Sequence, residues 1–144
     1  RAELLKKNWL PILVGCTVGA LTSMGSVYLL CRLFGLDEAM THSLIPKSVT
    51  TPIAVGISGS HGGMVPVTVV AVIITGIMGS IMAPWLIRIF RVSDSMTAGL
   101  AIGACSHAIG TSKAIELGET EGAMSGLAIG VCGILTVIFS LFLM

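Results

Sequence analysis

Charged residues are scarce in this chain. Asp, Glu, Lys and Arg together make up 10% of it, and the net charge is +1 at pH 7, whereas an average soluble domain is about 25% charged. The few basic residues form no cluster, which argues against a nucleic acid or a polybasic membrane surface as a partner. Together with a mean hydropathy of +1.00, this scarcity predicts an integral membrane protein in contact with the lipid bilayer.

Motifs for metal binding and for catalysis are also lacking. The three histidines and four cysteines do not share the spacing of a metal site, so we expect no metal and no other cofactor. Ser106 stands beside His107, but adjacency in a helix does not bring the hydroxyl to the ring, and no Asp follows to orient the ring. We therefore expect no enzymatic activity. The cysteines are interpreted as small buried apolar side chains: Cys16, Cys31, Cys105 and Cys132.

Long uncharged runs are what the chain has instead. They cover 24 residues from Asn8 to Cys31, 40 from Ser48 to Ile87 and 23 from Gly122 to Met144, and a helix needs about 20 residues to cross a bilayer. The runs show no period-two alternation, so they indicate helices. The sequence predicts three continuous transmembrane helices, at about 9–34, 65–89 and 122–144.

Two segments between these helices, 37–63 and 94–118, are each broken near the middle by polar residues. Each is either a discontinuous helix that crosses the bilayer or a re-entrant hairpin. Basic residues favour the cytoplasm. With Arg1, Lys6 and Lys7 inside, the later basic residues Arg88 and Arg91 return inside only if 37–63 is re-entrant.

Charge does not decide the same question for 94–118, which we take by analogy to be a hairpin entering from the opposite side. The predicted fold class is thus an all-α polytopic membrane protein, with three continuous transmembrane helices and two broken or re-entrant helical segments. In either topology the polar breaks of the two segments meet near the midplane.

The first break, 46–52, has the chemistry of an anion site. Thr51 suits a helix N-cap and Pro52 the first helical position, so a helix is expected to begin there with free amides at its positive end. Lys47 adds a full charge, and the hydroxyls of Ser48, Thr50 and Thr51 add donors. A small carboxylate fits this set. In the alternative, Lys47 extends to the outer surface and the prolines end an interfacial helix.

The second break, 106–113, repeats the pattern with different residues. Ser106 is expected to end a short helix, Gly110 to take the left-handed conformation of a helix stop, and Thr111 or Ser112 to cap the next helix. The ring of His107 titrates near neutral pH, so it either couples transport to protons or is a neutral hydrogen-bonding group.

Lys113 and Glu116, three residues apart on one helical face, either neutralise each other or take part in coupling. The candidate coupling or gating residues are His107, Lys113 and Glu116. The candidate substrate-binding residues are Lys47, Ser48, Thr50, Thr51, Pro52, Ser106, His107, Gly110, Thr111 and Ser112.

These motifs resemble a known family. The runs 45–54 (IPKSVTTPIA) and 106–111 (SHAIGT), followed by Glu116 and by 121–123 (EGA), are similar to the LrgB/CidB family of bacterial antiholin-like membrane proteins and the related plastid glycolate/glycerate transporter. The resemblance covers nearly the whole chain from about Trp9. It implies one LrgB-like transmembrane domain over 1–144, without the amino-terminal helices that family members usually carry, in the bacterial inner membrane.

The resemblance implies two functions. The favoured hypothesis is a carrier of small monocarboxylates such as glycolate, glycerate or pyruvate, with the anion held at the broken helix ends. The alternative is a holin- or antiholin-like regulator of murein hydrolase activity and cell lysis that assembles in the membrane. Implied partners are a holin-like LrgA-type protein and further copies of the chain. Assembly needs small-residue faces such as Gly15 and Gly19, whereas a carrier needs buried helix ends.

Overall fold

The computed structural model describes residues 2–144, and this part of the chain folds into helices without a strand. Three helices are long and apolar enough to span a membrane: α2 (Trp9–Leu33), α5 (Val65–Ile89) and α7 (Glu119–Leu143). The prediction of three spans is confirmed. The expected start of the last span is three residues late, because the helix begins with the acidic residues Glu119 and Glu121, which favour a helix amino end.

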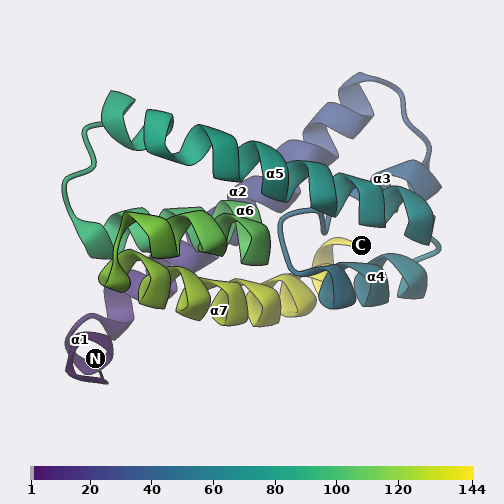
Figure 1. The fold of residues 1–144 in the computed structure, drawn as a ribbon. Coiled ribbons are helices and arrows are strands. Elements are labelled where there is room, and N and C mark those ends of the chain that lie inside the picture. Colours follow the sequence, from purple (N-terminus) through teal and green to yellow (C-terminus); the bar gives the residue numbers. More distant parts are fainter. Residues whose placement is uncertain (1) are drawn as a thin grey trace.

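Four shorter elements complete the fold: α1 (Ala2–Lys7), α3 (Glu38–Leu44), α4 (Thr51–Ser60) and α6 (Ser95–Leu117). Arg1, used above for orientation, lies outside the described residues. In Figure 1, α6 lies between α5 and α7, with which it makes its most extensive contacts, and α2 passes behind these three helices. The three long helices therefore enclose the two segments that the sequence marks as broken.

Residues 37–63 form a hairpin, here called the first hairpin, that enters and leaves at one end of the bundle. Nδ1–H of His42 donates to the carbonyl of His61 over 2.7 Å, and the amide of Met64 donates to Oγ of Ser43 over 2.6 Å. Both ends of the segment thus lie beside the start of α5. This geometry matches the hairpin interpretation of 37–63 and not the crossing one.

The second hairpin, residues 94–118, enters from the opposite end. α6 departs from helical geometry at His107, where φ is 44° and ψ is −142°. The chain then turns back, so that Leu117 and Ala98 line one hollow together with Arg88 at the end of α5. The two hairpins therefore enter from opposite ends of α5, as the sequence led us to expect.

Close helix packing in the second hairpin depends on glycine. A Cβ atom at Gly103 would overlap the carbonyl oxygen of Ser125 on α7, and one at Gly79 of α5 would overlap Oγ of Ser106. Between helices in lipid, close approach at small residues is a main source of stability, since burial from water contributes little there. The second hairpin is held by these close contacts at Gly103 and Gly79.

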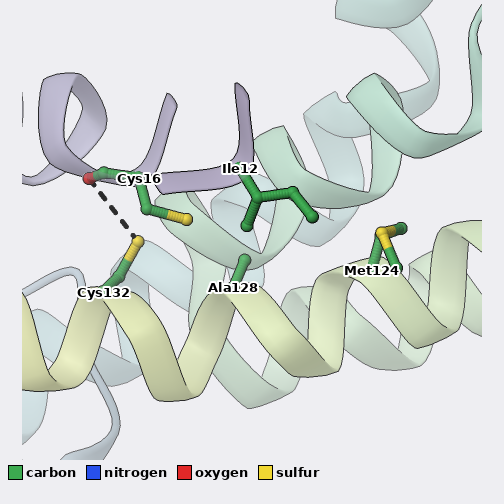
Figure 2. Close-up of a cluster of buried hydrophobic side chains, with 5 residues drawn as sticks. All are labelled: Ile12, Cys16, Met124, Ala128 and Cys132. Carbon is green, nitrogen blue, oxygen red and sulfur yellow. Dashed lines mark hydrogen bonds between the residues drawn. The ribbon is translucent and has the colours of Figure 1, made fainter. Parts of the chain in front are cut away.

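A separate cluster joins α2 to α7. Figure 2 shows its five buried side chains, which are Ile12, Cys16, Met124, Ala128 and Cys132. They follow the spacing of one helical face on each helix, as interior positions of packed helices do. This contact fixes the first span against the last one, and Met96, Leu100 and Ala104 of α6 pack against it.

Candidate functional site

The tips of the two hairpins meet at one residue of α5. Val72 packs its side chain with Val49 and Ala54 of the first hairpin. The carbonyl of the same residue accepts a hydrogen bond of 2.8 Å from Nε2 of His107 in the second hairpin. The two polar breaks, which the sequence predicted at one depth, therefore contact the same residue. The first contacts the side chain of Val72 and the second contacts its carbonyl.

The first tip, residues 45–50, places its cation inside the bundle. Lys47 Nζ donates to Oγ of Ser48 over 3.1 Å, and that oxygen lies 2.8 Å from Oγ of Ser23 in the middle of α2. Among residues 2–144, no carboxylate pairs with the Lys47 ammonium. This position disagrees with the alternative in which Lys47 extends to the outer surface.

A small cavity lies behind the first tip. It has a volume of about 10 Å³ and is lined by Ser23, Ser48, Ala104 of α6, and Thr136 of α7, among others. That volume holds about one water molecule. This cavity is therefore too small for a carboxylate.

The helix after the first tip begins one residue earlier than predicted. The N-cap is Thr50, in extended conformation at φ −61° and ψ 150°, and Thr51 is the first helical residue, so the assignment of Thr51 as N-cap was wrong. Pro52 in second position meets the same physical requirement, because the first four amides of a helix have no partner within it. The Thr50 side chain makes no capping hydrogen bond, so the positive end of α4 faces the tip.

At the second tip, residues 106–110, the turn is made by a different residue from the one predicted. His107, not Gly110, takes the positive φ; the prediction for Gly110 was wrong. Gly110 is helical, and its lack of Cβ lets the returning half pack on Ser106. A non-glycine residue in this conformation costs on the order of 1–3 kcal/mol, and burial of His107 together with its bond to α5 holds it there.

Thr111 does not cap a helix. Its hydroxyl lies within the returning half of α6, donates to the carbonyl of His107 over 3.0 Å and lies 2.7 Å from Oγ of Ser125. The returning half begins just after His107, so its positive end also faces the tips, beside the negative end of the half that precedes it. Thr111 thus ties the second tip to α7.

The comparisons with known proteins give the family. The LrgB-like family matches residues 1–144. This chain belongs to the LrgB family. The antiholin-like protein LrgB of Bacillus mycoides (strain KBAB4) is 38% identical over 138 residues, which cover 96% of this chain and 60% of that protein. The uncharacterized protein YxaC of Bacillus subtilis (strain 168) is 39% identical over 133 residues, which cover 92% of this chain and 58% of that protein. No solved structure matches the chain.

The resemblance drawn from the two tip motifs is thereby confirmed. The LrgB chain spans about three fifths of the length of these curated relatives. The name that the Bacillus mycoides relative carries favours the regulator alternative over the carrier hypothesis.

Three predicted residues of the LrgB chain lie away from the tips. Ser112 is exposed on the returning half of α6. Lys113 and Glu116 form an ion pair of 2.9 Å, with side chains 32% and 67% exposed. This geometry agrees with the alternative in which the two side chains neutralise each other. The other nine predicted binding residues lie in the two tips or directly after them. Lys113 lies about 9 Å along the helix from His107, at 1.5 Å per residue.

Two hydroxyls near the tips were missed by the sequence analysis. Ser23 and Thr136 lie inside the uncharged runs of α2 and α7, where a single hydroxyl that bonds its own helix is common. Only the approach of the first tip distinguishes Ser23 from such a residue. The one sequence signal is that Ser23 and Thr136 are polar residues within apolar runs.

Proposed function

We propose that the chain acts in an antiholin-like protein of the bacterial inner membrane, which regulates murein hydrolase activity and cell lysis without being an enzyme itself. The observation that carries this proposal is the 38% identity, over 96% of the chain, to a relative named antiholin-like protein LrgB. In this proposal the protein assembles in the membrane with further copies or with a holin-like partner of the LrgA type.

An exposed face of α2 supports assembly. Gly15 has no neighbouring atom within 4 Å of where a Cβ would stand, and the large apolar side chains Val14 and Val18 are exposed. Gly19 does not belong to this face, because the Cβ of Ala104 on α6 lies 3.6 Å from where a Cβ at Gly19 would stand. Helices in lipid associate closely where small residues let their backbones approach. A second helix seated on this face of α2 is the contact that the regulator proposal requires.

A second candidate function, a carrier of small monocarboxylates, has support from the geometry of the tips. Lys47 carries a charge with no carboxylate partner among residues 2–144, and the positive ends of two helical pieces, α4 and the returning half of α6, face the same place. Helix amino ends at mid-depth are a common way to hold an anion in transporters.

A groove begins beside the first helical turn after the first tip. It lies between α4 and α7, has a volume of about 350 Å³, and is lined by Pro52 at the start of α4, His61 at its end, and Ser140 of α7. Small-molecule sites have volumes of about 300–1,000 Å³. In the carrier proposal, the substrate moves along this groove and reaches Lys47 when the tips separate.

The deciding experiment measures flux through vesicles that contain the whole protein. A carrier gives saturable uptake of labelled glycolate or pyruvate that is reduced at least tenfold by Lys47→Ala and lowered by Thr51→Val. The matched control is Lys7→Ala, which removes an exposed lysine of α1 and is expected to leave uptake unchanged. An assembled regulator instead gives leakage of dye or protons without saturation.

The outcomes separate the two candidates. Saturable uptake that is unaffected by Lys47→Ala removes the site assignment and keeps the carrier. Absence of uptake by the whole protein removes the carrier and leaves the regulator, which must then change lysis or murein hydrolase activity when the protein is restored to a deletion strain.

A further inference from the structure

Two cysteines from distant parts of the sequence meet between α2 and α7. Figure 2 shows Cys16 and Cys132 with their side chains in the same space, where the Cys132 thiol donates to the carbonyl of Cys16 over 3.8 Å. The two cysteines are 1% and 3% exposed, so their contact is sealed from bulky reagents.

Cys132 also borders the small cavity behind the first tip, which it lines together with Ser48 and Thr136. With a volume of about 10 Å³, the cavity admits a molecule of about the size of water. Hydrogen peroxide is uncharged and only slightly larger than water. Among common oxidants of thiols, it is the one whose size and lack of charge suit this position.

The other two cysteines stand in different surroundings. Cys31 is buried at the far end of α2 among Val27, Met24 and Ile45. Cys105 is exposed on α6. Within residues 2–144, Cys16 and Cys132 are the two cysteines joined by a hydrogen bond, which gives this pair a proximity that the others lack.

We propose that Cys16 and Cys132 are a site of oxidative modification, at which hydrogen peroxide converts the two thiols into a disulfide that joins α2 to α7 beside the hairpin tips. This inference goes beyond the proposed function and does not depend on it. Cross-linking at this point ties the first span to the last and fixes the wall of the cavity against which the first tip rests.

The reaction balances with peroxide as the only co-reactant. One cysteine, as its thiolate, attacks a peroxide oxygen; the O–O bond breaks, and hydroxide leaves and takes up the proton that the thiol released, giving water and a sulfenic acid. The second cysteine attacks the sulfenic sulfur; the S–O bond breaks and a second water leaves. Two thiols are oxidised by two electrons and one peroxide is reduced to two waters. Either cysteine can be the one that is oxidised first.

The test treats the whole protein in lipid vesicles with hydrogen peroxide, removes the peroxide with catalase, unfolds the protein and labels the remaining thiols with a maleimide-polyethylene glycol. We expect two fewer labelled thiols than in the untreated protein, full recovery after dithiothreitol, and a linked peptide pair containing Cys16 and Cys132 in the mass spectrum. Because buried thiols react slowly, the loss is followed over minutes to hours.

Matched variants distinguish this pair from the others. Cys31→Ser and Cys105→Ser are expected to keep the loss of two thiols, whereas Cys16→Ser and Cys132→Ser abolish the linked peptide. Cys16→Ala and Cys132→Ala serve if a serine variant does not fold. The proposal is overturned if the wild-type protein keeps all its thiols, if the linked peptide involves Cys31 or Cys105, or if dithiothreitol does not restore the label.

Discussion

The two hairpins are held in place by different kinds of contact. The first is closed at its mouth by hydrogen bonds, in which His42, Ser43 and Thr68 contact the backbone or side chains of the other arm and of α5. Its tip is an irregular loop that carries a lysine. The second turns at one residue, His107, and is held along its length by glycine contacts with α5 and α7.

The difference shows which part of each hairpin can move. The first tip is held by side-chain contacts, of Ser48 with Ser23 and of Val49 with Val72, whereas helices in contact backbone to backbone move only as a unit. We therefore expect the first tip to be the part that opens the site, and the second hairpin to be the fixed wall against which it closes.

The largest expected effect is on the glycine contacts of the second hairpin. Gly103→Ala places a Cβ against the carbonyl oxygen of Ser125, and overpacking of a filled interior costs about 1–3 kcal/mol. The matched control in the first hairpin is Gly56→Ala, because no atom lies within 4 Å of that position and alanine favours a helix by about 1 kcal/mol. Thermal unfolding in detergent measures both. Equal effects would contradict the contrast between the hairpins.

The second prediction concerns the turn at His107. His107→Ala removes the donor to the buried carbonyl of Val72 and keeps a side chain at positive φ, which we expect to cost about 1–3 kcal/mol. His107→Gly loses the same bond but relieves the backbone. The glycine variant should therefore unfold at a higher temperature than the alanine variant. A higher unfolding temperature for the alanine variant would show that the backbone at His107 is not strained.

The third prediction concerns the mouth of the first hairpin. The hydroxyl of Thr68 is buried within 2.8 Å of the carbonyl of Ser43 and 2.7 Å of Oγ of Ser58. Thr68→Val keeps the shape and removes this link, at a cost of about 1 kcal/mol. Thr75→Val is the control, since Thr75 bonds only a carbonyl of its own helix. Hydrogen exchange at the amides of α4 should rise in the first variant and stay unchanged in the second.

The smallest effect is a pH dependence at the start of the second hairpin. The pKa of Asp94 is lowered from its ordinary value because the hydroxyl and amide of Thr97 donate to the carboxylate. A lowered folded pKa means that this stabilisation is complete above the pKa of the unfolded chain and is lost as the pH falls through the folded value. Unfolding temperatures measured on acidification below about pH 4 should fall less for Asp94→Asn, which keeps a capping side chain without the titration.

The sequence predicted the spans and the position of both tips because those features depend on local composition. Uncharged runs predicted the spans. The two prolines, the lysine and the nearby hydroxyl side chains of 46–52 predicted the first break. What the sequence did not reveal depends on tertiary contact. His107 takes the turn because a carbonyl 35 residues away holds its ring, while Gly110 is needed for packing and not for its conformational freedom.

The same reason explains the misplaced or missed polar residues. Lys113 and Glu116 looked like part of the second tip from their position in the sequence, but six to nine residues of helix carry them out to the surface. Ser23 looked like an ordinary residue of a span, and only the approach of Ser48 gives it a role. Whether these residues bind or couple a substrate stays a prediction.

Val72 has a consequence for the order in which the protein is built. The chain leaves the ribosome from its amino end, so the first hairpin is made before α5, and the second hairpin after it. Both tips contact Val72, one through its side chain and the other through its carbonyl. The first hairpin can therefore gain its contact with Val72 only after α5 has been made, and α5 then offers the second hairpin a partner that is already in place.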